Sequence, residues 1–402
     1  MLDHHLRGIS RELRDLCAGT RGKVLFAVSA GWFLSLGVRM VYPVILPHLR
    51  VAYGLDLATA GLLITVLWFA YAVGQAPAGV LGDAFGERVM LTLSTIISSI
   101  TLVFVLVAPV PSILFVSTAL FGFATALFGI ARYTVISKVF SDRDGTAIGI
   151  TLAAGSIGNV VLPETVGAVA AVTVWQLGLG VTIPLFLVIG GYLWWVVPSG
   201  LGGNSANTLS RATLQAVGAE LRRPAVVLVA AVLVLEFSLW QAFSGLYPTY
   251  LVEVKGVPAS TAAVLFGLYF AIGAVIQPLA GAAYDRLGIR KTFPVFLVPT
   301  ITGLIALPFA EGILQIALVT VLTGGMMANI AITMPYLTNI LHEDLQGSGL
   351  GILRTGYMMI GATSPLLFGI FADFGYFDQG FWILAGVGAL MILIAVRLPD
   401  IG

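Results

Sequence analysis

Five ionisable side chains stand inside long apolar stretches of this sequence, where they could bind a solute and carry a proton. They are Arg39, Arg132, Glu164, Glu236 and Arg354. A charged group at the centre of a bilayer costs about 2.5–3.5 kcal/mol on insertion scales, so such groups usually face a polar pathway inside the protein. Arginine offers five N–H donors to an anion, and a carboxyl group can accept and release a proton. These residues therefore predict a polar site at membrane depth.

Glu236 is the predicted proton-coupling residue. It is the twelfth residue of an expected helix that begins at Ala225, which places it about 18 Å along the axis and near the middle of a bilayer. Trp240, Ser244 and Tyr247 share its helix face and would form a polar, aromatic cavity wall. The alternative is a buried acid with a structural role. A core proton site has to be a carboxylate, because the four histidines fall at the N-terminus or in expected loops: His4, His5, His48 and His342.

Each of the other four charges has a functional and a structural interpretation. Arg39, about 22 Å into the first expected helix, would bind an anionic group in a cavity or extend to the outer interface. Arg132 would line the cavity or reach the cytoplasmic interface, and Arg354 would do either equally well. Glu164 would join proton coupling or only neutralise Arg39.

Uncharged polar and aromatic residues at helical spacing add further candidates for the cavity wall. Such stripes are also typical of helix packing, so both interpretations stay open. The candidates are Tyr42 beside Arg39, Trp68 with Tyr71 and Gln75, Tyr269 with Gln277, and Asn329 with Thr333 and Tyr336.

The composition explains why these charges are informative. Of 402 residues, 58% are hydrophobic and only 10% are charged, whereas a soluble domain carries about a quarter charged residues. The net charge of +1 gives no basic excess for nucleic-acid binding. The chain is therefore predicted to be an all-α membrane protein rather than a soluble enzyme, with the lipid bilayer as its surroundings.

Twelve segments are long and apolar enough to cross a bilayer, which takes roughly 20 helical residues. They are Val24–Pro47, Ala58–Leu81, Val89–Pro109, Pro111–Lys138, Gly145–Val169, Val174–Val197, Ala225–Tyr250, Ala259–Gly281, Thr292–Ala310, Gly312–Ile340, Gly347–Phe371 and Gly380–Arg397. The expected organisation is an N-terminal segment (1–23), a six-helix bundle (24–197), a linker (198–223), a second six-helix bundle (224–397) and a short tail (398–402). In the linker, Leu214, Val217 and Leu221 fit either a short helix on the membrane surface or a disordered connection.

The distribution of Lys and Arg predicts the orientation. With twelve spans both termini share one side, and that side would hold fifteen of these residues against two, Arg50 and Lys255, on the other. The positive-inside rule then places both termini in the cytoplasm of a multi-pass cell-membrane protein. Asp3, Glu12 and Asp15 in the first segment argue against a signal peptide.

An internal repeat relates the two halves at an offset of 202 residues. Ala72–Arg88 aligned with Ala274–Arg290 gives eight identities in seventeen positions. The same offset pairs Gly122 with Gly324, Pro163 with Pro365 and Gly167 with Gly369, among others. A single slip of register would remove these matches, so the chain is predicted to be two six-helix bundles in tandem.

The repeated loops carry a family resemblance. Gly79–Arg88 and Gly281–Lys291 resemble the G-x-L-x-D-R-x-G-R-R/K signature of the major facilitator superfamily, at the same two loops. The resemblance implies the fold of two pseudo-symmetric bundles, with the first helix of each triplet lining a cavity. It also implies a cytoplasmic gate formed by the motif residues, which are Gly79, Asp83, Gly86, Arg88, Gly281, Asp285, Arg286, Gly288 and Arg290. The first copy departs from the signature, with Ala84 and Glu87 where basic residues are usual.

Together these features predict a secondary transporter that works by alternating access, a symporter or antiporter, and not an enzyme. The expected partners are a small-molecule substrate and protons, the expected state is a monomer, and no cofactor or metal is expected, because no nucleotide-binding loop or Cys/His cluster occurs. Three core arginines against two carboxylates favour an anionic or neutral substrate. The alternatives are a proton-coupled exporter of hydrophobic drugs, favoured by the aromatic candidates, and a transporter-like receptor.

Overall fold

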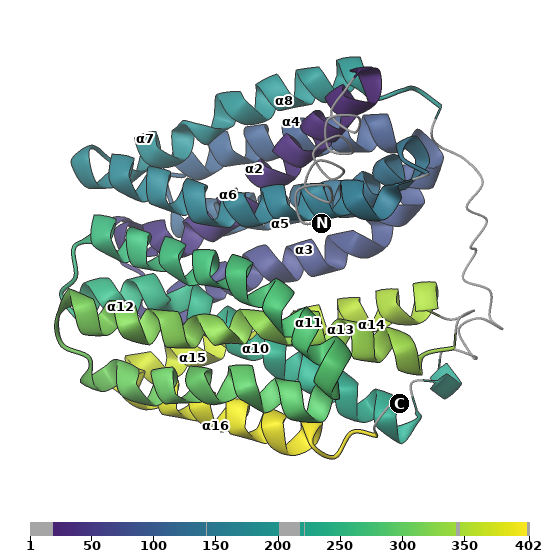
Figure 1. Cartoon of the computed structure of the whole chain (residues 1–402). Helices are drawn as coiled ribbons and strands as arrows, with labels where there is room; N and C mark the ends of the chain where they lie inside the picture. The colour runs from purple at the N-terminus through teal and green to yellow at the C-terminus, as the bar shows by residue number, and fades with distance from the viewer. Residues whose placement is uncertain (1–18, 142, 201–217, 221, 343–345, 400–402) are drawn as a thin grey trace, which may run out of the picture.

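The computed structural model describes residues 19–141, 143–200, 218–220, 222–342 and 346–399, and every regular element among them is a helix (Figure 1). The elements in chain order are α2 (Gly19–Tyr53), α3 (Leu57–Phe85), α4 (Glu87–Leu106), α5 (Pro111–Val139), α6 (Asp144–Val172), α7 (Trp175–Gly180), α8 (Thr182–Val196), α10 (Pro224–Glu253), α11 (Ala259–Ala306), η1 (Leu307–Phe309), α12 (Gly312–Thr323), η2 (Gly324–Ala328), α13 (Asn329–Ile340), α14 (Gln346–Gly361), α15 (Ser364–Asp373) and α16 (Phe377–Ala395).

The structure confirms the predicted set of membrane-spanning helices. Eleven segments are long and apolar enough to span a bilayer, and one of them, Ala259–Phe309, has 51 residues. That segment contains two spans, because Gly288 inside α11 has φ 70° and ψ 173°, a conformation no helix contains. Counted in this way, the described part of the chain has twelve spans.

The 202-residue repeat is visible in the helix boundaries. α11 begins 202 residues after α3, α14 begins 202 residues after α6, and α16 begins 202 residues after α7. Gly86, between α3 and α4, has φ 80°, and its counterpart Gly288 has φ 70°. Helices α2–α8 form one bundle and α10–α16 the other, and the two lie side by side in Figure 1, the first running from purple to teal and the second from teal to yellow.

Glycine residues let the two halves approach closely at two seams, α3 against α15 and α6 against α11. A Cβ at Gly61 would overlap the backbone of Pro365, and a Cβ at Gly369 would overlap the backbone of Leu57. We call the end where α2 begins the proximal end and the opposite end, where α3 begins, the distal end. Gly61, Gly369 and their partners lie toward the distal end.

Several boundaries differ from the predicted ones. Helix α2 continues to Tyr53, so His48 lies in a helix and not in a loop. The helix runs through Pro43 and Pro47 and ends only before Gly54, whose φ of 64° no helix allows. Five predicted spans are less regular than expected. α7 and α8 form one span, α12, η2 and α13 a second, and α14 and α15 a third, while the single helix α11 contains the other two. The expected linker helix and the N-terminal segment fall largely outside the described residues.

Candidate substrate-binding site

A cavity of about 250 Å³ lies between the two halves. Helices α2 and α3 supply one wall, and α10, η2, α13 and α14 supply the other. Among the residues predicted for the site, Arg39, Glu236, Trp240 and Arg354 line it. The full lining is Trp32, Leu36, Arg39, Trp68, Tyr71, Leu233, Glu236, Phe237, Trp240, Met326, Met327, Ile330, Arg354, Tyr357 and Met358.

Arg39 is fully buried, and its guanidinium group is held among aromatic rings. Its Nε donates a hydrogen bond to the carbonyl of Ser35, one turn earlier, at 3.0 Å. The guanidinium carbon lies 3.8 Å from the ring centre of Tyr71 and 4.8 Å from that of Trp68. Neither Nη1 nor Nη2 has a hydrogen-bond partner among the described residues. The side chain is thus fixed in place by the Ser35 carbonyl and the two rings.

Arg132 lies behind the cavity wall and contacts it through Trp32. The guanidinium carbon is 3.3 Å from the ring centre of Trp32, and Arg39 approaches the same ring at 5.4 Å. Arg132 is only 2% exposed, and its Nε and Nη1 have no partner within the described part of the chain. Because a cation is attracted to an aromatic face, Trp32 partly offsets the repulsion between the two arginines.

Arg354 enters the cavity from α14, in the other half. It interacts electrostatically with Tyr71 and Tyr133 of the first half as well as with Tyr357 on its own helix. Repulsion acts between Arg354 and both Arg39 and Arg132. Three cations therefore gather around one cavity, without an ion pair between them and any carboxylate that the structure describes.

Glu236 is the one carboxylate in the lining, and it is 8% exposed. The hydroxyl of Thr333 on α13 lies 3.0 Å from its Oε2. Thr333 itself is fully buried and also lies 2.9 Å from the carbonyl oxygen of Asn329, on the preceding turn. Glu236 therefore links α10 to the start of α13, directly after the 3₁₀ segment η2.

Aromatic rings from both halves meet beside the charged groups. Trp68 on α3 packs edge-on against Trp240 at 5.3 Å and against Phe237 at 6.1 Å, both on α10. Phe237 also contacts Tyr357 of α14 at 5.7 Å. The indole N–H groups of Trp32 and Trp240 are buried without partners among the described residues. The cavity thus presents N–H donors and aromatic faces together.

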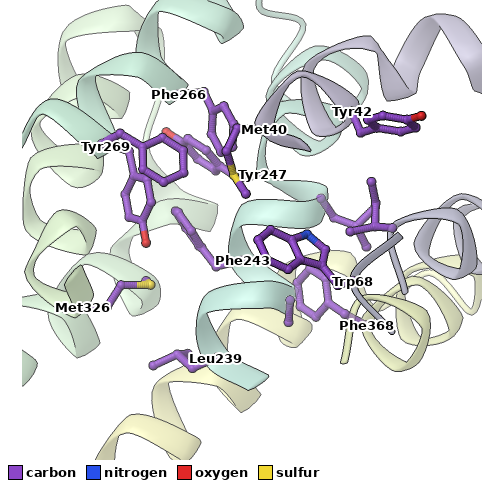
Figure 2. Close-up of a cluster of buried hydrophobic side chains, with 14 of the residues drawn as sticks. Met40, Tyr42, Trp68, Leu239, Phe243, Tyr247, Phe266, Tyr269, Met326 and Phe368 are labelled. Carbon is purple, nitrogen blue, oxygen red and sulfur yellow. The ribbon is translucent and has the colours of Figure 1, made fainter. Parts of the chain in front are cut away.

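Several predicted candidates do not line the cavity: Tyr42, Gln75, Arg132, Glu164, Ser244, Tyr247, Tyr269, Gln277, Asn329, Thr333 and Tyr336. Tyr42 stacks on Phe121 inside the first half, and Tyr247 bonds to Thr320 and stacks on Phe243 inside the second. Figure 2 shows Tyr247 near Phe243 and Tyr269, with Tyr42 on the opposite side of the view. Asn329 is fully buried, and its side-chain amide has no partner among the described residues. Glu164 is exposed on α6, near the seam with α11.

Some lining residues had only a weak signal in the sequence or none. Trp32 precedes Arg39 by seven residues and therefore lies on the same helix face, a spacing that could have identified it. Phe237, Tyr357 and the methionines on η2 and α14 have no such signal, because they come together only when spans 7, 10 and 11 pack. Within the described residues no cluster of His, Cys, Asp or Glu could hold a metal ion.

The repeated motif lies at the proximal end. Gly86 and Gly288 have positive φ, as the turn requires. Arg88 stacks on Trp194, with its guanidinium carbon 4.2 Å from the ring centre, and Arg290 donates to the carbonyl of Leu398 at 2.6 Å. Both partners belong to the same half as the arginine. Other motif residues are accessible in this structure. Asp83, Asp285 and Arg286 are exposed. A Cβ at Gly79 or Gly281 would meet no other atom within 4 Å.

Two six-helix bundles around a central polar cavity are the architecture of a membrane transporter. The family model of the Major Facilitator Superfamily matches residues 27–332 and again 256–400, and the chain belongs to this superfamily. It is therefore a multi-pass membrane protein of a family of secondary transporters, and not an enzyme.

Its relatives by sequence include the probable sulfoacetate transporter SauU of Cupriavidus necator, 25% identical over 95% of this chain and 96% of that one. The probable nitrate/nitrite antiporter NarK1 of Thermus thermophilus is also 25% identical, over 72% of this chain and 67% of that one.

Solved structures share the fold. The nucleoside transporter NupG superposes with a TM-score of 0.79 at 14% identity, over 93% of this chain and 98% of that one. A bacterial homologue of the human lysosomal transporter Spinster, in an inward-facing and occupied conformation, superposes with a TM-score of 0.78 at 16% identity. The match covers 95% of this chain and 98% of that one.

Proposed function

We propose that this protein moves a small anion across the cell membrane by alternating access, with Glu236 as the proton-coupling group. The observation that carries the proposal is the set of buried N–H donors around the cavity that have no partner in the part of the chain that the structure describes. Arg39 contributes Nη1 and Nη2, Arg132 contributes Nε and Nη1, and Trp32 and Trp240 each contribute Nε1. Buried donors that remain unbonded are costly, and an anionic solute is the ligand that would bond to those of the residues that line the cavity.

The charge balance of the site supports the same proposal. Arg39, Arg132 and Arg354 place three positive charges near the cavity against the single carboxyl group of Glu236. An anion would relieve the repulsion among the arginines, whereas a cation would add to it. The names of the two relatives, which refer to sulfoacetate and to nitrate and nitrite, agree with an anionic substrate.

The competing proposal is a proton-coupled exporter of hydrophobic cations. Its support is the aromatic wall formed by Trp68, Phe237, Trp240 and Tyr357. Aromatic faces also bind the protein's own cations, however, and here Arg39 already occupies the faces of Trp68 and Tyr71. We therefore prefer the anion.

The test uses purified full-length protein in liposomes under an imposed pH gradient, with a panel of organic and inorganic anions and of lipophilic cations. Accumulation of an anion that Arg39→Ala abolishes would support the anion proposal. Glu236→Gln is expected to abolish accumulation driven by the pH gradient while leaving exchange of substrate for substrate. Extrusion of a lipophilic cation without transport of any anion would overturn the assignment. The orientation with the proximal end in the cytoplasm is checked by protease access to the C-terminal tail.

A further inference from the structure

The cavity has an apolar region as well as a cationic one. Arg39 lines it from α2, while the wall of the second half carries Leu233, Met326, Met327, Ile330 and Met358 beside Glu236 and Arg354. These side chains offer water almost no hydrogen bonds, since thioether sulfur is a weak acceptor and aliphatic carbon is none. Methionine also adapts its shape to an apolar ligand, because the side chain is unbranched and flexible. A solute that fills the cavity must therefore present carbon as well as charge.

The volume sets the size of that solute. An engineered apolar cavity of about 150 Å³ binds benzene. At about 250 Å³, this cavity has room for a six-membered ring together with a charged headgroup, on the order of ten non-hydrogen atoms. A small inorganic anion would fill only the part near the arginines and would leave water against the apolar wall.

We infer that the substrate is a small organic anion with an apolar ring or branched alkyl body, such as an aryl or cycloalkyl carboxylate or sulfonate. The headgroup lies between Arg39 and Arg354, and the body lies against Met326, Ile330 and Met358. This inference rests on the proposed function, since it assumes an anionic substrate, and it adds the chemistry of the rest of the molecule.

The test compares ligands that separate charge from apolar body, using binding to the purified full chain measured by calorimetry. Benzoate and cyclohexanecarboxylate are expected to bind at least about tenfold more tightly than acetate, nitrate or sulfoacetate, because they bury a ring. Benzyl alcohol, which has the ring without the charge, is expected to bind weakly. If nitrate or acetate binds as tightly as benzoate, the inference fails and the proposed anion transport stands. If only neutral or cationic ring compounds bind, both fail.

Two neighbouring methionines provide a matched pair of variants. Met358 lines the cavity, and Met359, the next residue on α14, does not. Met358→Gln is expected to weaken benzoate binding about tenfold with little effect on acetate, whereas Met359→Gln changes neither. Equal loss for benzoate and acetate in Met358→Gln would contradict the assigned position of the ring.

A different part of the molecule carries a second, independent inference. At the distal end, the carboxylate of Asp373 on α15 accepts hydrogen bonds from the backbone N–H groups of Leu57 at 2.8 Å and Ala58 at 2.7 Å. These N–H groups open α3 in the other half, and the first turn of a helix has no partners for them within the helix. Asp56 caps the same helix from within its own half, by accepting from the N–H of Thr59 at 2.7 Å.

The internal repeat shows that this contact exists at only one of two related seams. The offset of 202 residues relates the α3–α15 seam to the α6–α11 seam and pairs Gly369 with Gly167, opposite Ala263. At the related seam the counterpart of Asp373 is Ala171, and the first residue of α11, Ala259, is the counterpart of Leu57. The second seam thus has the close packing without the carboxylate.

We propose that Asp373 is a gate residue of the distal end. Its two hydrogen bonds to α3 hold the halves together beside the ion pair of Arg50 on α2 with Glu253 on α10, and they must break whenever that end opens. The favourable interaction of a carboxylate with a helix N-terminus strengthens both bonds. This proposal does not depend on the identity of the substrate. It also distinguishes the two seams. Opening the α3–α15 seam breaks the hydrogen bonds of Asp373, whereas the α6–α11 seam has alanine at the related position.

Distance measurements between spin labels at the distal ends of α2 and α10 test the gate. The chain has one cysteine, Cys17, so a Cys17→Ser background accepts labels at Val51 and Val254, which are both exposed. Asp373→Ala is expected to increase the population with a long Val51–Val254 distance several-fold. Ala171→Asp adds a carboxylate at the position that the repeat relates to Asp373, and it is expected to reduce that population.

Asp56→Ala is the matched control, because it removes a cap from the same helix without breaking a bond between the halves. It should leave the distance distribution unchanged. Should Asp373→Ala leave the distribution as in the unmodified protein, or should Asp56→Ala shift it equally, Asp373 is a helix cap and not a gate.

Discussion

The hydroxyl of Thr333 lies between two acceptors, 3.0 Å from Oε2 of Glu236 and 2.9 Å from the carbonyl oxygen of Asn329. A hydroxyl has one hydrogen, so it can donate to only one of them at a time. When Glu236 is ionised, Thr333 donates to the carboxylate. When Glu236 carries a proton, Glu236 can donate to Thr333, which then donates to Asn329. The direction of this bond thus follows the protonation of Glu236.

Replacing Thr333 tests whether this bond takes part in coupling. Thr333→Val keeps the side-chain shape and loses the hydroxyl, and one hydrogen bond is worth about 1 kcal/mol. The pH at which transport is half-maximal is expected to shift by about half a unit or more in Thr333→Val, while Thr333→Ser retains the original profile. The measurement is initial uptake into liposomes over a series of pH values. An unchanged profile in Thr333→Val would exclude a role for this hydroxyl in coupling.

Substrate binding at position 39 is expected to need the planar geometry of arginine as well as its charge. The planar guanidinium group stacks on Tyr71 while its Nη atoms stay available, and lysine cannot reproduce this arrangement. Arg39→Lys is expected to raise the substrate concentration for half-maximal transport at least about tenfold with a smaller effect on the maximal rate. Lys255→Arg, at the distal surface, serves as a control and should change neither. Equal kinetics for Arg39→Lys and the unmodified protein would show that charge alone suffices.

The N-terminal cap of α3, Asp56, predicts how the stability of the protein changes at acid pH. Hydrogen bonds from Thr59 hold the pKa of Asp56 below its usual value of 3.8, so the ionised form is favoured in the folded protein. A lowered pKa means that this contribution to stability is present at neutral pH and is lost as the pH falls through the folded value. Asp56→Asn keeps a capping side chain without the charge. Its melting temperature should therefore fall less than that of the unmodified protein between pH 5 and pH 3.

Sequence reasoning succeeded for features that repeat or have strong periodicity. The twelve spans follow from hydropathy, and the 202-residue offset located the related helices and the paired turn glycines Gly86 and Gly288, which share a positive φ. The three core arginines could be found because charge is rare in apolar helices. Their convergence on one cavity could not, because it depends on how α2, α5 and α14 pack against one another.

Tyr42 and Tyr247 illustrate the limit of helical spacing as evidence. Both share a face with a charged residue in the sequence, yet each stacks on a phenylalanine within its own half, Tyr42 on Phe121 and Tyr247 on Phe243. A membrane-spanning helix of about 30 residues has several turns, and only the middle turns of one face reach the cavity. Spacing identifies the face, whereas the depth and the tilt of the helix decide which residues line the site.

Gly122 tests the close packing within the first half. A Cβ at Gly122 on α5 would overlap the backbone carbonyl of Leu67 on α3, so the two helices would have to move apart. Gly122→Ala is expected to destabilise the protein by about 1–3 kcal/mol, measured as a fall of several degrees in melting temperature. Gly149→Ala on α6 is the control, because a Cβ there meets no other atom within 4 Å. Alanine has the higher helix propensity, so this variant should match or exceed the original stability. If both substitutions lower the melting temperature equally, glycine flexibility rather than close approach explains the requirement at Gly122.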